Sequence, residues 1–269
     1  MGPDNMQGSV AAIICAAGSS SRMGGLKKEF LPLPAAGIEG RVSPPGTAGK
    51  SLTVLASALN AFVSSSRIGP IVITVPPGSE AAARSCLPPE LCQNRVLFAA
   101  GGTSRRASVY NALSQLEPYH PSHVLIHDGA RPWIKPELVE QIIDAAIRFD
   151  AVIPALPVLE TAKELFSHLP DREGIAAGEG PVFIKRHLRR SDLCSAQTPQ
   201  GFSFPQILEA HRKAAEREAA ARKTGAWNNG EKFEYTDDAE VWGEFAGQVA
   251  VIPGDIENRK ITYPEDMRC

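Results

Sequence analysis

The residues with the clearest chemical potential lie in the stretch Val10–Leu33, VAAIICAAGSSSRMGGLKKEFLPL. A short apolar run leads into the small residues Ala16–Ser21, and a loop without bulky side chains lets a ligand approach backbone N–H groups that can point at an anion. Arg22, Lys27 and Lys28 follow within a few residues and are potential phosphate partners. A strand, a bare loop and fixed cations together predict a nucleotide triphosphate site.

Two better-known phosphate-binding motifs are absent from the sequence. A P-loop requires Gly-x-x-x-x-Gly-Lys-Ser/Thr, and counting from Gly18 finds no Gly-Lys at that spacing. A Gly-Lys-Ser run begins at Gly49, but Pro44 occupies the position of its first glycine. The dinucleotide fingerprint fails because Ser20 and Ser21 stand where its later glycines would be needed.

Polar clusters also follow other predicted strands, and we expect them to meet at one edge of a sheet. The four clusters are Gly18–Lys28, Gly101–Ser108, Asp128–Arg131 and Gly254–Lys260. Each alone has an ordinary interpretation, such as a tight turn, a helix cap at Thr103 or Ser104, an Asp128–Arg131 ion pair or a surface lysine. Their joint occurrence favours a site.

Asp128 is the best metal candidate, because one carboxylate together with phosphate oxygens and water is a common way of holding Mg²⁺. The preceding residue, His127, should point to the opposite face of its strand and is expected to be a core or supporting histidine. The sequence shows no Ser-His-Asp or Cys-His arrangement. Cations dominate instead, which favours transfer at phosphorus, where an anionic attacking oxygen needs no general base.

The elements that must position these residues alternate between strands and helices. Short apolar runs predict strands at Val10–Cys15, Ile71–Val75, Arg95–Ala100, His123–His127, Ala151–Val158 and Val249–Ile252. Helical spacing predicts helices between them, the first capped by Ser51. The alternation predicts a mostly parallel sheet with helices on both faces. Pro154 and Pro157 favour an irregular or edge strand at Ala151–Val158, and Glu160–Arg190 is predicted to be a projecting arm or hairpin.

Composition limits the remaining possibilities. The 269 residues are 43% hydrophobic, enough for one large α/β domain or two small ones, and the net charge of −2 predicts no nucleic-acid partner and no membrane surface. No apolar run reaches the roughly 20 residues that span a bilayer. The five scattered cysteines form no C-x-x-C pair, so neither a zinc site nor a disulfide framework is indicated. We therefore expect a reduced, cytoplasmic protein.

Beyond these patterns, the chain resembles the 2-C-methyl-D-erythritol 4-phosphate cytidylyltransferase family. The matching segments occur in family order from residue 10 to residue 266 and read AAGSSSRMG, KKEFLPL, GGTSRRASVYNAL, HDGARP, PVLETAKE, SAQTPQGF, TDDAEV and NRKITYPEDM. The resemblance implies a Rossmann-like nucleotidyltransferase domain over residues 8–269, with a β-arm at 160–190 that forms a homodimer. It also implies a reaction of CTP with 2-C-methyl-D-erythritol 4-phosphate in the non-mevalonate isoprenoid pathway, giving the CDP-linked product and pyrophosphate.

Site roles follow from the resemblance, residue by residue. The implied catalytic cations at the phosphates are Arg22, Lys28 and Lys260. The implied nucleotide-binding residues are Ala16, Ala17, Gly18, Gly102, Thr103, Ser108 and Asp128, the last of which would also hold Mg²⁺ or another divalent cation. The implied residues for the sugar-alcohol phosphate are Arg131, Thr161 and Arg190, the last two reaching into the partner subunit's site.

The chain also departs from the family pattern. Glu160 replaces the Asp of the family's Asp-Thr pair, and Glu29 stands in the place of the Gln in its Gln-Phe-Leu. Loops at 35–50, 168–181 and 223–232 are longer than usual. Two alternatives stay open from the sequence: a cytidylyltransferase acting on ribitol 5-phosphate, which would differ in the arm, and a non-catalytic nucleotide-binding relative.

Overall fold

An eight-stranded sheet forms the centre of the molecule, in the order β10-β5-β9-β4-β1-β2-β3 with β8 also paired to β5. The computed structural model describes residues 9–34, 52–92, 95–166, 182–224 and 234–267. The strands are β1 Val10–Cys15, β2 Ile68–Val75, β3 Val96–Ala100, β4 His123–Asp128, β5 Ala151–Pro157, β8 Cys194–Ala196, β9 Gln200–Ser203 and β10 Ala250–Pro253. Strands β1 to β4 run parallel, as do β5 and β10, whereas β8 and β9 are antiparallel to their neighbours. The predicted mostly parallel sheet is confirmed.

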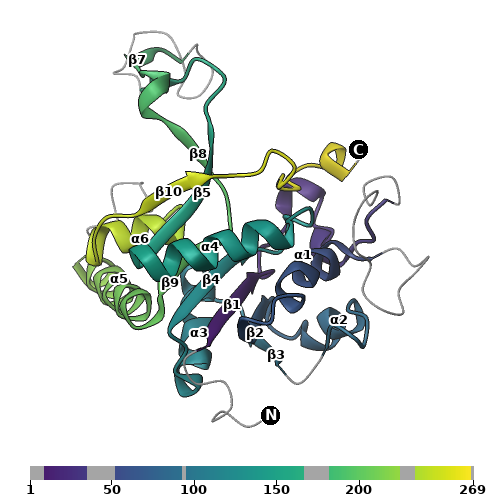
Figure 1. Cartoon of the computed structure of the whole chain (residues 1–269). Coiled ribbons are helices and arrows are strands. Elements are labelled where there is room, and N and C mark those ends of the chain that lie inside the picture. Colours follow the sequence, from purple (N-terminus) through teal and green to yellow (C-terminus); the bar gives the residue numbers. More distant parts are fainter. Residues whose placement is uncertain (1–8, 35–51, 93–94, 167–181, 225–233, 268–269) are drawn as a thin grey trace.

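Helices cover both faces of this sheet (Figure 1). On one face lie α1 Val54–Val63, α2 Glu80–Ser85 and α4 Pro136–Phe149, and on the other lie α3 Arg105–Leu116, α5 Phe204–Thr224 and α6 Asp238–Phe245. Alternation along β1 separates the two cores, because Ala12 and Ile14 pack on the first face and Ala11 and Ile13 on the second. Short 3₁₀ turns complete the described elements: Ser21–Met23, Lys28–Phe30, Glu117–Tyr119, Arg190–Asp192 and Pro264–Met267.

The first helix begins later than the sequence indicated. Ser51 lies outside the described residues, and α1 starts at Val54 with Thr53 as its cap. The Thr53 hydroxyl accepts a hydrogen bond from the N–H of Ala56 at 3.1 Å, which satisfies one of the free donors of the first turn. The capping residue is therefore Thr53.

The sequence predicted an irregular or an edge strand here, and because β5 is internal, the edge position was wrong. It has β10 on one side and both β9 and β8 on the other. Pairing on that second side is interrupted between β9 and β8, and there the carbonyl of Pro154 accepts from the N–H of Gln197 at 2.8 Å. Since a strand residue directs its N and O atoms to the same side, the missing N–H of Pro154 faces this interruption and breaks no regular ladder.

The predicted arm is confirmed within the described residues. Strands β6 Lys163–Leu165 and β7 Ile184–His187 pair antiparallel in a separate two-stranded sheet. Figure 1 shows this hairpin extending away from the end of β5 and β8. Three long loops predicted from the sequence fall wholly or mostly outside the described residues. They are 35–50, 168–181 and 223–232. Only residues 223 and 224 of these loops are described, and they form the end of α5.

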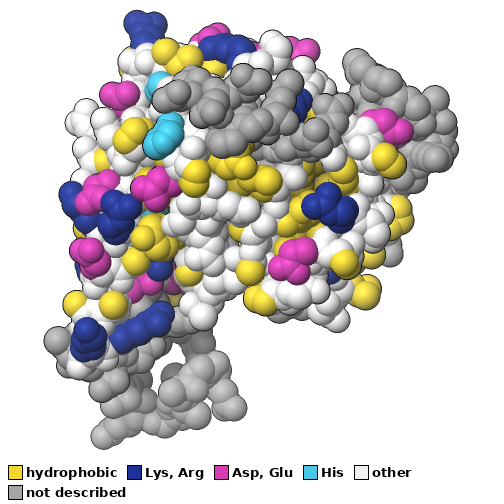
Figure 2. All heavy atoms as spheres, turned by 90° about the horizontal axis from the view of Figure 1, so that it is seen from below, with side chains coloured by type: hydrophobic (Ala, Val, Ile, Leu, Met, Phe, Trp, Pro, Cys, Tyr) yellow, Lys and Arg dark blue, Asp and Glu magenta, His cyan; other side chains and the backbone are white. Residues whose placement is uncertain are grey.

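On the face of the molecule that Figure 2 shows, acidic and basic side chains are interspersed. Neither sign of charge forms a continuous surface there. Among the described helices, none combines the length and the apolar character that a membrane crossing requires.

Candidate active site

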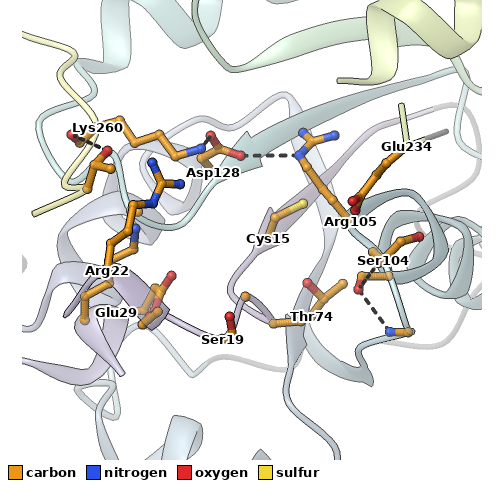
Figure 3. A pocket seen from close by; sticks show the side chains of 18 of the residues that line it. Cys15, Ser19, Arg22, Glu29, Thr74, Ser104, Arg105, Asp128, Glu234 and Lys260 are labelled. Atoms are coloured by element: carbon orange, nitrogen blue, oxygen red, sulfur yellow. Dashed lines mark hydrogen bonds and ion pairs between the residues drawn. The ribbon is translucent and has the colours of Figure 1, made fainter. Parts of the chain in front are cut away.

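A cavity of about 460 Å³ lies where β1, β2, β3 and β4 end (Figure 3). The carboxyl ends of parallel strands meet at one edge of the sheet, which is where such folds bind ligands. Residues from all four predicted polar clusters line the cavity, among them Ala17, Gly18, Arg22, Lys28, Gly102, Thr103, Ser108, Asp128 and Lys260. The predicted convergence of the clusters is therefore observed.

The small-residue loop after β1 offers backbone donors to this cavity. The N–H of Ala16 continues the sheet and donates to the Thr74 carbonyl at 2.9 Å. Among the described residues, by contrast, the N–H groups from Ala17 to Ser20 donate to no protein acceptor. Ser20 has a positive φ of 51°, which turns the chain into the following 3₁₀ helix. The loop therefore has donors available for an anion, while Ala16 itself is buried beneath it.

Three cations line one part of the cavity. Arg22 is exposed and its guanidinium carbon lies 5.8 Å from the centroid of the Tyr263 ring. Lys28 is half-buried and its ammonium donates to the Ile261 carbonyl at 2.6 Å. Burial lowers the pKa of Lys28 below its ordinary value. Figure 3 shows Arg22 and Lys260 on the same side of the cavity, where Lys260 pairs with Asp128. These three side chains can contact a shared polyanion.

Asp128, the last residue of β4, contributes a carboxylate to the lining of the cavity. Its Oδ2 lies 2.7 Å from Lys260 Nζ, and its Oδ1 lies 3.7 Å from Arg105 Nε. Burial alone raises the pKa of Asp128, but Arg105, Lys260 and Arg131 together outweigh burial and hold it well below its usual range. The group is therefore an ionised oxygen ligand at neutral pH.

The donor set fits a hard cation held mainly by its substrate. The described residues contain no cluster of three His, Cys, Asp or Glu side chains that could hold a metal alone. A single ionised carboxylate lining a cavity of this kind fits Mg²⁺, which takes one or two carboxylates and completes its shell with phosphate oxygens and water. Asp128 is the residue that would hold it.

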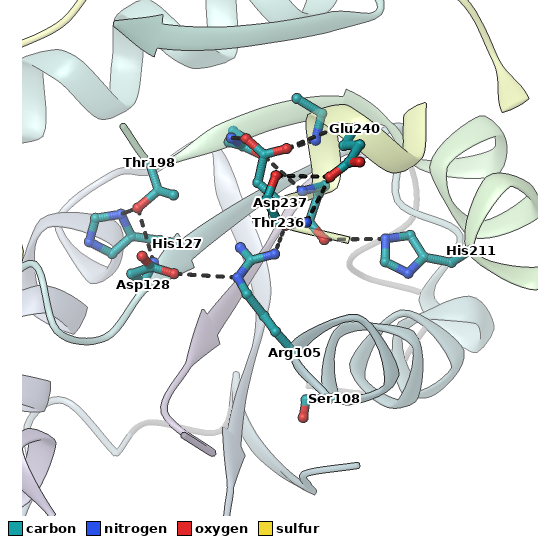
Figure 4. Close-up of polar contacts among 12 residues, drawn as sticks. Arg105, Ser108, His127, Asp128, Thr198, His211, Thr236, Asp237 and Glu240 are labelled. Carbon is teal, nitrogen blue, oxygen red and sulfur yellow. Dashed lines mark hydrogen bonds and ion pairs between the residues drawn. The ribbon is translucent and has the colours of Figure 1, made fainter. Parts of the chain in front are cut away.

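A buried hydrogen-bond chain fixes the backbone of Asp128 (Figure 4). The N–H of Asp128 donates to Thr198 Oγ1 at 3.0 Å, and Oγ1 also lies 3.0 Å from His127 Nδ1. His127 Nε2 lies 3.2 Å from the Arg131 carbonyl, which can only accept, so Nε2 carries the proton and Thr198 donates to Nδ1. Burial lowers the pKa of His127 to about 4. The core or supporting role expected of His127 agrees with this geometry.

The other end of the cavity is formed by the turn from β3 into α3. The Gly102 N–H donates to Ser108 Oγ at 3.0 Å, and Ser108 Oγ donates to the Ser104 carbonyl at 2.9 Å. Ser104 caps α3 by accepting from Ala107 N at 3.1 Å. A side chain at Gly102 would place its Cβ 2.5 Å from that of Ala107, so only glycine fits. This end of the cavity is therefore lined by small polar groups held in fixed positions.

The residues expected at the sugar-alcohol phosphate lie outside this cavity's lining. Arg131 is largely buried and donates from Nη1 to the Asn258 carbonyl at 2.7 Å, which supports the loop carrying Lys260. Thr161 and Arg190 are exposed at the base of the arm, where Arg190 donates to the Leu159 carbonyl at 2.8 Å. The roles expected of these three residues stay predictions.

Sequence reasoning missed several residues that shape the site. Arg105 lies between two acids, 3.7 Å from Asp128 and 2.8 Å from the fully buried Asp238. Arg105 lies in the family-matching segment GGTSRRASVYNAL and Asp238 in TDDAEV. Those matches were the one sign in the sequence that these two residues belong to the site. Thr198 lies in the matching segment SAQTPQGF, but nothing in the sequence indicates that it contacts Asp128. Glu29 also lines the cavity and was noted only as a departure.

Comparison with known proteins places the chain in a family. The family model described as "IspD: 2-C-methyl-D-erythritol 4-phosphate cytidylyltransferase" matches residues 10–269. The 2-C-methyl-D-erythritol 4-phosphate cytidylyltransferase of Pelotomaculum thermopropionicum is 33% identical over 260 residues, covering 96% of this chain and 91% of the relative. The solved structure of that name from Thermus thermophilus is 29% identical, with a TM-score of 0.60 and coverage of 95% and 94% of the two chains.

A second solved structure, the 4-diphosphocytidyl-2C-methyl-D-erythritol synthase of Anaerococcus prevotii, shares the fold. Its TM-score is 0.68 at 24% identity, and the match covers 98% of this chain and 95% of that one. The expected α/β nucleotidyltransferase fold is therefore confirmed. With the family model matched along nearly the whole chain, this protein belongs to the 2-C-methyl-D-erythritol 4-phosphate cytidylyltransferase family.

Proposed function

We propose that the chain transfers CMP from CTP to 2-C-methyl-D-erythritol 4-phosphate, giving 4-(cytidine 5'-diphospho)-2-C-methyl-D-erythritol and pyrophosphate. One observation carries the proposal. Arg22, Lys28 and Lys260 line one cavity together with the ionised Asp128, beside a loop with available N–H donors. Family membership supports the choice of CTP and the sugar-alcohol phosphate as substrates.

In the proposed reaction, an oxygen of the sugar-alcohol phosphate attacks the α-phosphorus of CTP in line. The new P–O bond forms as the bond from the α-phosphorus to the α–β bridging oxygen breaks, and pyrophosphate leaves with that electron pair. The attacking oxygen is already anionic, so the barrier is dominated by charge repulsion and positioning. Lys28 and Lys260 stabilise charge at the α-phosphate, and Arg22 binds the leaving phosphates.

Asp128 would hold Mg²⁺ in this scheme, and the ion would neutralise phosphate charge when bound. Lys260 pairs with the Oδ2 atom of Asp128 at 2.7 Å, so this lysine would stay close to the carboxylate that would hold the ion. Arg105 would stay beside Oδ1 because Asp238 anchors its other end. Titrating the protein with Mn²⁺ and following its electron paramagnetic resonance signal tests the role of Asp128, since Asp128→Asn should weaken binding in the presence of CTP.

The cytosine would lie at the Gly102–Ser108 end. Gly102, Thr103 and Ser108 line a short turn in which the hydroxyl and the backbone are fixed by hydrogen bonds. A pocket built of small groups favours a pyrimidine over a purine by size. The ribose and α-phosphate would then pass Ala17 and Gly18 toward the cations.

The arm would complete the site of a second copy of the chain. Among the residues that the structure describes, neither strand of the arm has a buried side chain, and six large apolar side chains on or beside them are exposed: Leu159, Leu165, Phe166, Val182, Phe183 and Ile184. Apolar patches of this kind mark contact surfaces. In a homodimer formed through residues 160–190, Thr161 and Arg190 would bind the sugar-alcohol phosphate in the partner's cavity.

A pyrophosphate-release assay tests the reaction. Purified protein is supplied with CTP, UTP, ATP or GTP, and with either 2-C-methyl-D-erythritol 4-phosphate or ribitol 5-phosphate as acceptor. We expect release only with CTP and faster release with the methylerythritol phosphate. Preference for ribitol 5-phosphate would replace the proposed acceptor, and no release with any pair would leave a non-catalytic nucleotide-binding protein.

Subunit mixing tests the arm. One variant, Lys28→Ala, has a damaged cavity and an intact arm. The other, Arg190→Ala, has an intact cavity and a damaged arm. The homodimer of each variant should therefore be inactive. If arms act in the partner's site, subunit exchange between the two variants should restore about a quarter of the wild-type activity, from the one intact site in each heterodimer. No recovery after proven exchange would show that each arm serves its own chain.

A further inference from the structure

Lys27 makes two contacts that join separate parts of the phosphate-facing loop. Its ammonium donates to the Gly18 carbonyl at 2.5 Å and lies 3.1 Å from Glu29 Oε2. The lysine side chain is 18% exposed and that of Glu29 only 5%, so the ion pair is largely removed from water. Such a pair is screened less by salt than a surface pair.

Glu29 is an unexpected charge for this position. Glu29 lines the same cavity as Arg22 and Lys28, and Figure 3 shows its side chain on the same side of the cavity as Arg22. The Ser20 hydroxyl donates to Oε2 at 3.4 Å, which gives the carboxylate a second, weaker partner. An unpaired carboxylate here would repel a triphosphate, because the interaction between two anions is strong where water is largely excluded.

Gly18 lies within the part of the loop that offers backbone donors. Because the peptide group is planar and trans, fixing the Gly18 carbonyl on Lys27 turns the N–H of Ser19 in the opposite direction. That N–H donates to no other described group. The contact with Lys27 therefore sets the orientation of a peptide whose N–H is available to an anion.

We propose that Lys27 is a positioning residue for the triphosphate: it neutralises Glu29 and orients the Gly18–Ser19 peptide, without itself touching the substrate. This role rests on the proposed use of CTP. It differs from the role of Lys28, which lines the cavity itself and whose ammonium donates to the Ile261 carbonyl.

Calorimetric titration of CTP with Mg²⁺, without acceptor, tests the role on four proteins. Lys27→Met keeps the length of the side chain and removes its charge, and Glu29→Gln keeps shape and removes the opposing charge. We expect Lys27→Met to weaken CTP binding about tenfold, the effect of exposing one like charge at intermediate dielectric. The double variant Lys27→Met with Glu29→Gln should recover most of the loss, and Glu29→Gln alone should bind CTP at least as tightly as the wild type.

Kinetics and a matched control separate this role from a structural one. Lys27→Met should raise the KM for CTP while leaving kcat at saturating CTP within about twofold, because only binding is affected. Arg67→Met removes a cation that pairs with Glu140 and Asp144 just before β2 begins, at the opposite edge of the sheet, and should not change CTP affinity.

Three outcomes would overturn the inference. If the wild type binds CTP and Lys27→Met binds it equally well, the role of Lys27 is refuted and the proposed function stands. If Glu29→Gln fails to rescue Lys27→Met, the neutralising role is refuted. A wild-type protein that binds no CTP would refute the proposed function, and the role of Lys27 with it.

Discussion

Replacing Thr198 by valine tests whether the buried hydrogen-bond chain supports the site. The side chain keeps its shape, but the Asp128 N–H and His127 Nδ1 both lose their partner. Each orphaned buried polar group costs about 1–3 kcal/mol, and the added methyl returns about 1 kcal/mol. We therefore expect Thr198→Val to lower the free energy of unfolding by roughly 3 kcal/mol.

Urea unfolding followed by circular dichroism measures this difference, with Thr198→Ser as the matched control. Serine keeps the hydroxyl and loses only a methyl group, so it should destabilise the protein by about 1 kcal/mol. Turnover should follow the same order, because Asp128 is positioned through its own N–H. The reasoning is refuted if Thr198→Val proves as stable as Thr198→Ser.

Three further perturbations follow from the site. Lys28→Ala should leave the circular dichroism spectrum unchanged and lower kcat by about 10²–10³, as the loss of one charge-stabilising donor does; near-normal kcat would remove Lys28 from the mechanism. Gly102→Ala should abolish CTP binding in calorimetry, because its Cβ would lie 2.5 Å from that of Ala107; unchanged affinity would contradict the assigned cytosine end. Burial raises the pKa of Cys15 to about 12, so at pH 7.5 iodoacetamide should label the exposed Cys194 and spare Cys15, as peptide mass spectrometry can determine; equal labelling would show that Cys15 is not shielded.

The repeating elements could be predicted from the sequence because their signal is local. The continuous apolar runs of β1 and β4 and the helical spacing of α4 can each be recognised within one segment, without knowledge of distant residues. The four clusters could likewise be placed together, because parallel strands bring their carboxyl ends to one edge. Element boundaries shifted by a few residues, as with β2, which begins at Ile68 rather than Ile71.

The remainder depends on contacts between distant segments. Strand β9, at Gln200–Ser203, was missed because four residues after a proline carry no periodic pattern, and its place between β4 and β5 is set by pairing alone. The edge position predicted from Pro154 was wrong for the same reason, since the interruption beside Gln197 is what makes a proline acceptable in this internal strand. The link from Thr198 to Asp128 spans 70 residues and could not be inferred from either segment.

Strand β9 also has a consequence for when the enzyme can become competent. It is inserted between β4 and β5, although it is synthesised more than 70 residues after β4 ends, so the sheet stays split until that late segment arrives. Contacts of such long sequence separation form slowly. The same insertion brings the Thr198 hydroxyl within hydrogen-bond distance of the Asp128 N–H. The sheet is thus completed in the same step that fixes the backbone of Asp128, the residue that would hold a cation. A nascent chain that lacks this segment has neither the complete sheet nor the hydrogen bond from Asp128 to Thr198.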